Sequence, residues 1–158
     1  MYESDPSGDT AISMAESGQL TVYMMACGIE VESVEISVAT DVPGGVPKAE
    51  RFFLEGPQSG YVELALPEST TDESKILSDI AADPELPFWV TPITFEGESE
   101  EPRFVPPLNG ITVSEIQAFP VDSLLVEHYE AGSHGPTPLE EVSREQFVEG
   151  KLVECGAL

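Results

Sequence analysis

The proline and glycine residues constrain this chain more than any other feature, because they divide it into short segments. Fourteen prolines and thirteen glycines are spread over 158 residues, and clusters such as Pro43-Gly44-Gly45 mark turns. Between the turns lie short apolar runs and stretches in which apolar and polar residues alternate, which is typical of β-strands. We therefore expect a mostly β protein, a sandwich or barrel-like sheet of roughly seven short strands, with one or two short helices.

The clearest strands are expected in the first half of the chain. Residues 20–27 are a short apolar run, and residues 29–40 alternate with one slip of phase near Ser33. A β-bulge at Ser33 keeps both halves of the second segment facing the core. Residues 51–54 and 61–66 are expected to form a hairpin that turns at the glycine- and proline-containing segment between them.

Three further strands are expected in the second half. Residues 88–95 are apolar, but Pro92 cannot donate a backbone hydrogen bond, which favours an edge strand or a broken strand. Residues 111–119 and 121–129 are β-prone and are separated by a sharp bend at Pro120.

One helix is expected over residues 71–82. Thr70 and Glu73 have the spacing of a capping box, and Asp83-Pro84 ends the segment. Its apolar stripe consists of Ile76, Leu77 and Ile80. A second helix is expected over residues 138–149, in which Leu139, Val142 and Phe147 point inward. The alternative for this region is a hairpin that pairs residues 146–148 with residues 151–153.

The composition predicts two regions along the chain. Residues 1–18 are small and polar, with Ala11, Ile12 and Met14 as isolated apolar residues, and are expected to be a flexible N-terminal arm. Residues 19–158 are expected to form a single β-rich domain. The N-terminus has acidic residues and no apolar run, so we expect neither a signal peptide nor a transmembrane segment, and a cytoplasmic or virion location.

The charge limits the kinds of partner. Thirty acidic residues oppose six basic ones, for a formal net charge of −24. The six bases are scattered, whereas nucleic acids and anionic membranes are bound by clustered lysine and arginine, so neither partner is expected. Three explanations remain: adaptation to high salt, where screening weakens self-repulsion; a negative surface that binds a basic partner; and ordinary acidity without special meaning.

Catalytic and metal-binding motifs are weak in this sequence. Glu127, His128, Glu130 and His134 bring both histidines together with two carboxylates, which are ligands for transition metals. In an extended strand the two carboxylates point in opposite directions, so an exposed strand end explains the segment better than a metal site. The sequence contains no nucleophile-elbow or phosphate-loop motif, and no cofactor is expected.

Phe88 and Trp89 are adjacent large aromatic residues, and Trp89 is the only tryptophan of the chain. They are either an anchor for a protein partner or part of the core, and core packing is favoured.

These observations favour a non-catalytic structural or assembly protein with a high-salt-adapted surface, for example a virion component of a capsid or tail. Such a protein acts through self-association or within a larger assembly. The first alternative is an acidic inhibitor, immunity protein or nucleic-acid mimic that binds a basic partner. The second alternative is an enzyme whose site follows no known motif.

Overall fold

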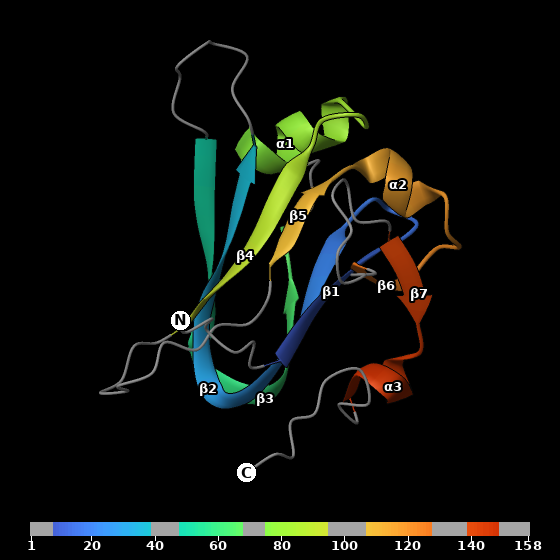
Figure 1. The fold of residues 1–158 in the computed structure, drawn as a ribbon. Coiled ribbons are helices and arrows are strands. Elements are labelled where there is room, and N and C mark those ends of the chain that lie inside the picture. The colour runs from blue at the N-terminus through green and yellow to red at the C-terminus, as the bar shows by residue number, and fades with distance from the viewer. Residues whose placement is uncertain (1–7, 39–47, 68–74, 95–106, 128–138, 149–158) are drawn as a thin grey trace, which may run out of the picture.

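The computed structural model describes residues 8–38, 48–67, 75–94, 107–127 and 139–148. In this part of the chain one seven-stranded antiparallel sheet curls into a half-barrel, and three short helices lie against it (Figure 1). The strands are β1 (Gly8–Met14), β2 (Leu20–Val38), β3 (Lys48–Ala65), β4 (Phe88–Thr94), β5 (Leu108–Ile111), β6 (Leu124–Glu127) and β7 (Leu139–Val142). The helices are α1 (Lys75–Ala82), α2 (Val113–Gln117) and α3 (Arg144–Val148). The expected mostly β class is therefore confirmed.

β2 is one long strand of 19 residues that contains the expected irregularity. Val31 and Val34 are both fully buried in the same apolar core. Residues three positions apart in a regular strand face opposite sides of the sheet, so their shared burial marks a slip of phase. The pairing with β3 and with β4 shifts between Val31 and Ser33, which confirms the bulge.

The expected hairpin between residues 51–54 and 61–66 is wrong, because residues 48–65 form the single strand β3. The pairing of β2 with β3 is irregular between the pairs Ala26–Gly60 and Ser33–Phe53. The register before this irregularity is the same as the register after it. Extra residues in β2 are thus compensated by extra residues in β3. Gly60 has φ +76°, a conformation that glycine adopts easily, so the strand bends at this position and does not reverse.

The bend in β2 and β3 sets the shape of the sheet. The strand order is β5-β4-β2-β1-β6-β7, and β3 lies along the other edge of β2. The first half of β2 pairs with β1 and the second half pairs with β4, along the same edge. The curled ribbon of β2 and β3 therefore joins two smaller sheets that face each other across the core (Figure 1).

The expected flexible arm over residues 1–18 is wrong for residues 8–14, which form β1 between β2 and β6. Ala11 and Ile12 are both fully buried, and they face opposite sides of the sheet. The buried Ser13 hydroxyl lies 3.0 Å from the Tyr23 hydroxyl, within hydrogen-bond distance. This hydrogen bond allows a polar side chain that suggested an exposed segment to be buried. Residues 1–7 lie outside the described residues.

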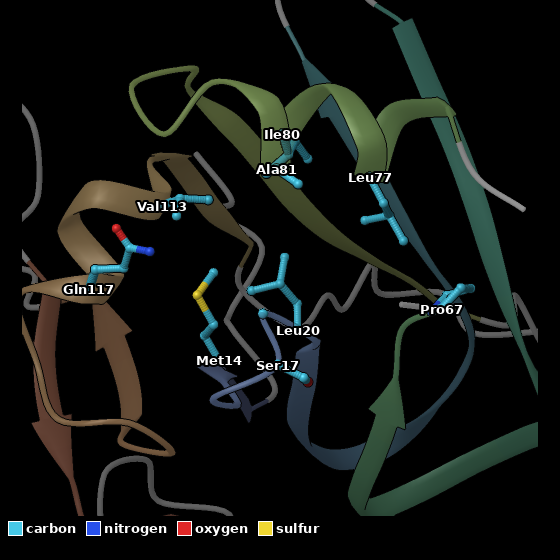
Figure 2. Close-up of a pocket in the computed structure, with 10 residues that line it drawn as sticks. Met14, Ser17, Leu20, Pro67, Leu77, Ile80, Ala81, Val113 and Gln117 are labelled. Carbon is cyan, nitrogen blue, oxygen red and sulfur yellow. The ribbon is translucent and has the colours of Figure 1, made fainter. Parts of the chain in front are cut away.

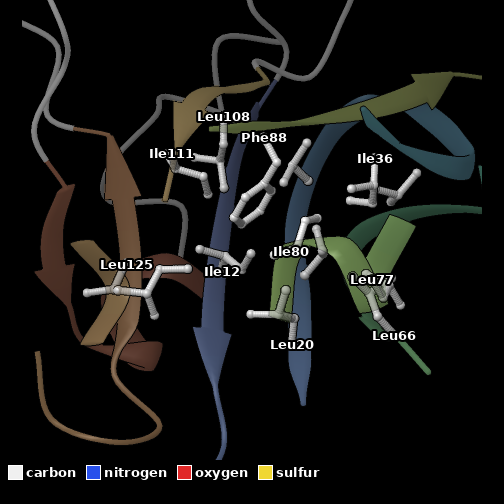
Figure 3. Close-up of a cluster of buried hydrophobic side chains, with 14 of the residues drawn as sticks. Ile12, Leu20, Ile36, Leu66, Leu77, Ile80, Phe88, Leu108, Ile111 and Leu125 are labelled. Atoms are coloured by element: carbon white, nitrogen blue, oxygen red, sulfur yellow. The ribbon is translucent and has the colours of Figure 1, made fainter. Parts of the chain in front are cut away.

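The main core fills the inside of the curl (Figure 3). Ile12 of β1 and Ile36 of β2 meet there with Phe88 of β4, all without exposed surface. Helix α1 covers one end of this core with Ile76, Leu77 and Ile80, so the predicted apolar stripe is confirmed. The expected cap residues Thr70 and Glu73 lie outside the described residues.

The strands expected at residues 111–119 and 121–129 are wrong over much of their length. β5 ends at Ile111, and residues 113–117 form helix α2. Thr112 caps this helix, because its hydroxyl accepts a hydrogen bond of 3.2 Å from the backbone N–H of Glu115. Val113 and Ile116, three residues apart, give α2 a buried side. Of the second segment, residues 121–127 are described, and among these only Leu124–Glu127 form a strand.

The helix expected over residues 138–149 is partly correct. Residues 139–142 form β7, which pairs with β6, and the helix occupies only residues 144–148. Ser143 caps it: its hydroxyl accepts from Gln146 N at 3.0 Å, and Gln146 Oε1 accepts from Ser143 N at 3.2 Å. The alternative hairpin is wrong for residues 146–148, which are helical.

β4 is an edge strand over only part of its length. It lies between β2 and β5 at Phe88 and Val90, where both neighbours pair with it. Pro92 lies beyond the β5 pairs, where β4 has β2 alone as its partner in the described chain. The expectation that Pro92 belongs to an edge is therefore correct only for the second half of the strand.

The burial of β1 predicts a large effect of Ile12→Ala. Removing a fully buried isoleucine side chain leaves a cavity, so the free energy of unfolding should fall by about 2–5 kcal/mol. Val121→Ala is the control: Val121 is 59% exposed, and its loss should change stability by less than about 0.5 kcal/mol. Denaturant unfolding of both variants measures the difference. Equal midpoints for Ile12→Ala and the unmodified protein would restore the flexible-arm interpretation.

Candidate functional site

The residues proposed as weak metal ligands are only partly described. His128, Glu130 and His134 lie outside the described residues. Glu127 ends β6, and one of its carboxylate oxygens accepts a hydrogen bond from the backbone N–H of Asn109. No group of three or more histidine, cysteine, aspartate or glutamate side chains is placed to hold a metal ion within the described ranges. The expectation that this segment is an exposed strand end and not a metal site therefore stays untested.

The two aromatic residues proposed as an interaction anchor lie on opposite faces of β4. Phe88 is fully buried in the main core, so it cannot contact a partner and the core interpretation is correct for it. Trp89 is half-buried on the other face. A Cβ added at Gly110 would lie 3.7 Å from its ring, so Trp89 packs over the backbone of β5 at Gly110.

Trp89 belongs to a three-stranded surface that we call the outer face. The pairings of β2 with β3 and β4 place nine side chains on this side of the sheet. They are Ser33, Glu35 and Ser37 of β2, Ala49, Arg51 and Phe53 of β3, and Trp89, Thr91 and Ile93 of β4. Phe53 is 67% exposed, which is unusual for a phenylalanine.

The outer face carries no net charge. Glu35 and Arg51 are the charged members of the nine, and Arg51 Nε lies 3.5 Å from a Glu35 carboxylate oxygen. The whole chain has 30 acidic residues. A protein of this charge repels copies of itself over most orientations, and the outer face is a surface where that repulsion is locally weak.

Next to the outer face, the strand β3 has an edge that no strand of the described chain covers. Within the described residues β3, which is 18 residues long, pairs with β2 alone. Backbone groups along an open strand edge are able to bind a further strand, and natural proteins usually block such edges with charges, prolines or bulges. Pro57 and the irregularity beside it interrupt the middle of β3, whereas the segment Lys48–Phe53 pairs regularly with β2.

A second surface lies further along the sheet under α3, on the side that faces away from the main core, as the outer face does. Here the Tyr61 ring is 6.5 Å from the Tyr23 ring and 6.3 Å from the Phe147 ring, centre to centre. The Arg144 guanidinium lies 5.4 Å from the centre of the Tyr23 ring, within the range of a cation–π interaction. These contacts hold α3 on β2 and β3.

Tyr61 is the group of this cluster with a perturbed pKa. Burial is the largest cause, and the negative charge of Glu63 is the next, so the pKa of Tyr61 rises from 10.0 to about 12. The Tyr61 hydroxyl also donates a 3.2 Å hydrogen bond to Glu63, which favours the protonated phenol.

An apolar pocket lies at the end of the half-barrel that α1 and α2 cover (Figure 2). Its volume is about 220 Å³. Leu20, Leu77, Ile80 and Val113 form buried walls, and Ser17 and Gln117 lie at the exposed rim. A second hollow of about 250 Å³ shares Met14 and the β1–β2 turn with it and continues past α2.

Comparison with known proteins identifies no relative. No protein-family model, no curated protein and no solved structure matches this chain. None of the described helices has the length and apolar character needed to cross a membrane.

Sequence reasoning missed the outer face and the pocket. Phe53 lies within the run Arg51-Phe52-Phe53-Leu54, in which three consecutive apolar residues hide which side faces the core. The alternation of Ser33, Glu35 and Ser37 was the available signal for a polar outer side. The pocket depends on α2, which was expected to be a strand, so the sequence did not indicate that the lining residues lie together.

The raised pKa of Tyr61 predicts how stability changes with alkaline pH. The folded state holds the Tyr61 hydroxyl proton more tightly than the unfolded state does. The contribution of Tyr61 to the free energy of unfolding is therefore complete below pH 10 and is lost as the pH rises to about 12. Glu63→Gln removes the neighbouring charge and should lower the pKa of Tyr61. Nuclear magnetic resonance of isotope-labelled tyrosine measures it. Glu16→Gln, in the turn between β1 and β2, is the control, because Glu16 is not among the groups that shift the pKa of Tyr61. An equal shift in both variants would contradict the assignment.

Proposed function

We propose that the protein is a non-catalytic structural subunit that associates with a second copy of itself through the outer face and the open edge of β3. A high-salt environment is part of the proposal, and a capsid or tail subunit of a virion is one concrete form of it. The observation that carries the proposal is the outer face, a surface without net charge that bears an exposed phenylalanine, on a chain of net charge −24.

The charge favours a second copy over an unrelated partner at this surface. Two molecules of the same strong negative charge approach each other most easily where neither presents excess charge. The segment Lys48–Phe53 also includes two of the six basic residues, Lys48 and Arg51, together with Glu50. A second β3 strand laid along this edge would extend the sheet through backbone hydrogen bonds and would bury Phe53.

Phe53→Asp tests this proposal directly. It adds an unpaired negative charge to the outer face, on the strand β3 that the proposal places at the interface, and should shift the protein from a larger species to a monomer. Val121→Asp is the matched control, because Val121 is the other large exposed apolar side chain of the described chain, with 59% exposure against 67% for Phe53. Light scattering over a concentration series near 1 M salt, where the screening length is about 3 Å, measures the mass of each variant.

Two results would contradict self-association through this surface. One is a monomeric unmodified protein at every concentration. The other is an equal loss of association in Phe53→Asp and Val121→Asp, which would show that any added charge has the same effect.

The high-salt part of the proposal makes a separate prediction. At low ionic strength the screening length is about 30 Å, so the net negative charge destabilises the folded chain, and near 1 M salt only adjacent charges still interact. The melting temperature should therefore rise with sodium chloride concentration, and potassium chloride should have the same effect if screening is the cause. A melting temperature that stays flat or falls would contradict adaptation to high salt.

A second candidate function is binding of a basic protein by the acidic remainder of the surface. The observation in its favour is the same separation of charge, since an acidic inhibitor or nucleic-acid mimic also leaves one face neutral. This alternative predicts that Phe53→Asp leaves binding of a basic protein unchanged. It also predicts that the complex weakens as salt rises.

A further inference from the structure

The pocket at the helix-covered end has the character of a ligand site that is independent of the outer face. Its walls come from five parts of the chain: the end of β1 at Met14, the turn and start of β2 at Leu20, Pro67 after β3, α1 and α2 (Figure 2). None of its ten lining residues is charged. In a chain with 30 acidic residues, a concave surface free of carboxylates is well suited to apolar molecules.

Hydrogen bonds hold the rim of this pocket in place without a ligand. Gly18 has φ +91° and forms the tight turn between β1 and β2, where its N–H donates to the Ala15 carbonyl at 2.9 Å. Gln19 Nε2 donates to the Leu66 carbonyl at 2.9 Å and ties this turn to the end of β3. Such fixed walls lower the entropy that binding must overcome.

A similar bond fixes the two helices. The N–H of Ser114, in the first turn of α2, donates to the Pro84 carbonyl, which follows α1, at 3.0 Å. The two helices therefore keep their distance across the pocket, and the cavity between them does not depend on flexible side chains alone.

The size and chemistry of the pocket define the class of ligand. Its volume is about 220 Å³, which exceeds the cavity of about 150 Å³ that is known to bind benzene when its walls are aliphatic and aromatic. Leu77 and Ile80 offer aliphatic contact at depth, while Ser17 and Gln117 offer hydrogen bonds at the mouth. Anionic ligands such as fatty acids are disfavoured, because the net charge of the protein repels them.

We propose that this pocket binds a small uncharged molecule that has an aliphatic or aromatic body and at most one hydrogen-bonding end. The body lies against Leu20, Leu77 and Val113, and the polar end meets Ser17 or Gln117. Binding here buries the partly exposed Met14, whose flexible thioether adapts to different shapes.

The test uses the uncharged dye N-phenylnaphthylamine, whose fluorescence rises in apolar surroundings, with the full-length protein. Ala81→Trp places a large side chain at the mouth of the pocket and should weaken dye binding by at least about tenfold. Ala82→Trp is the matched control: Ala82 is also exposed on α1 but does not line the pocket, and it should change binding by less than about twofold. Melting curves of both variants confirm that each is folded.

Two outcomes would overturn the proposal. They are no binding of the dye by the unmodified protein, and equal binding by the two tryptophan variants, whether unchanged or weakened. The sulfonated analogue of the dye tests the charge of the ligand, and it should bind more weakly than the uncharged dye at low salt. Equal affinity for the two dyes would contradict the preference for uncharged molecules.

Discussion

The structure depends on the pairing of β2 with β3 over almost their whole length. Each strand contains extra residues, those of β2 just after Ala26 and those of β3 just after Phe53, and the two sets compensate each other. The register is therefore kept while the ribbon bends. Because one edge of β2 accepts β1 before the bend and β4 after it, both small sheets depend on this ribbon. The positions of the core, the outer face and the pocket all follow from where the ribbon places the two small sheets.

Sequence periodicity predicted the elements whose buried side is apolar without interruption. The stripe of α1 and the phase slip near Ser33 are of this kind, and both are confirmed. β1 was missed because Thr10 and Ser13 are polar, and the burial of Ser13 depends on the Tyr23 hydroxyl of the neighbouring strand. The α2 segment was missed because its β-prone residues also fit a capped helical turn. Local turn chemistry around Gly56 and Gly60 suits a bend as well as a reversal, so only the pairing with β2 decides between them.

Charge and apolar surface are distributed in complementary ways. The described surface includes a sheet face without net charge and a pocket without charged lining residues, which differ in shape and so in the partners they suit. A flat face with an open strand edge suits another protein chain, whereas a narrow hollow with fixed walls suits a small molecule. The high negative charge keeps such a protein dispersed, and it makes a surface without excess negative charge a place where association meets less repulsion.

The contact between Arg144 and Tyr23 has a consequence for synthesis on the ribosome. These residues are 121 positions apart, and a ribosome adds about 5–20 residues per second, so Tyr23 waits about 6–24 seconds for its partner. During this interval β1 also lacks β6, its second neighbour in the finished sheet. The first strand to be made is thus among the last to be enclosed. The rate at which the C-terminal segment is translated therefore sets how long a nascent chain exposes that edge.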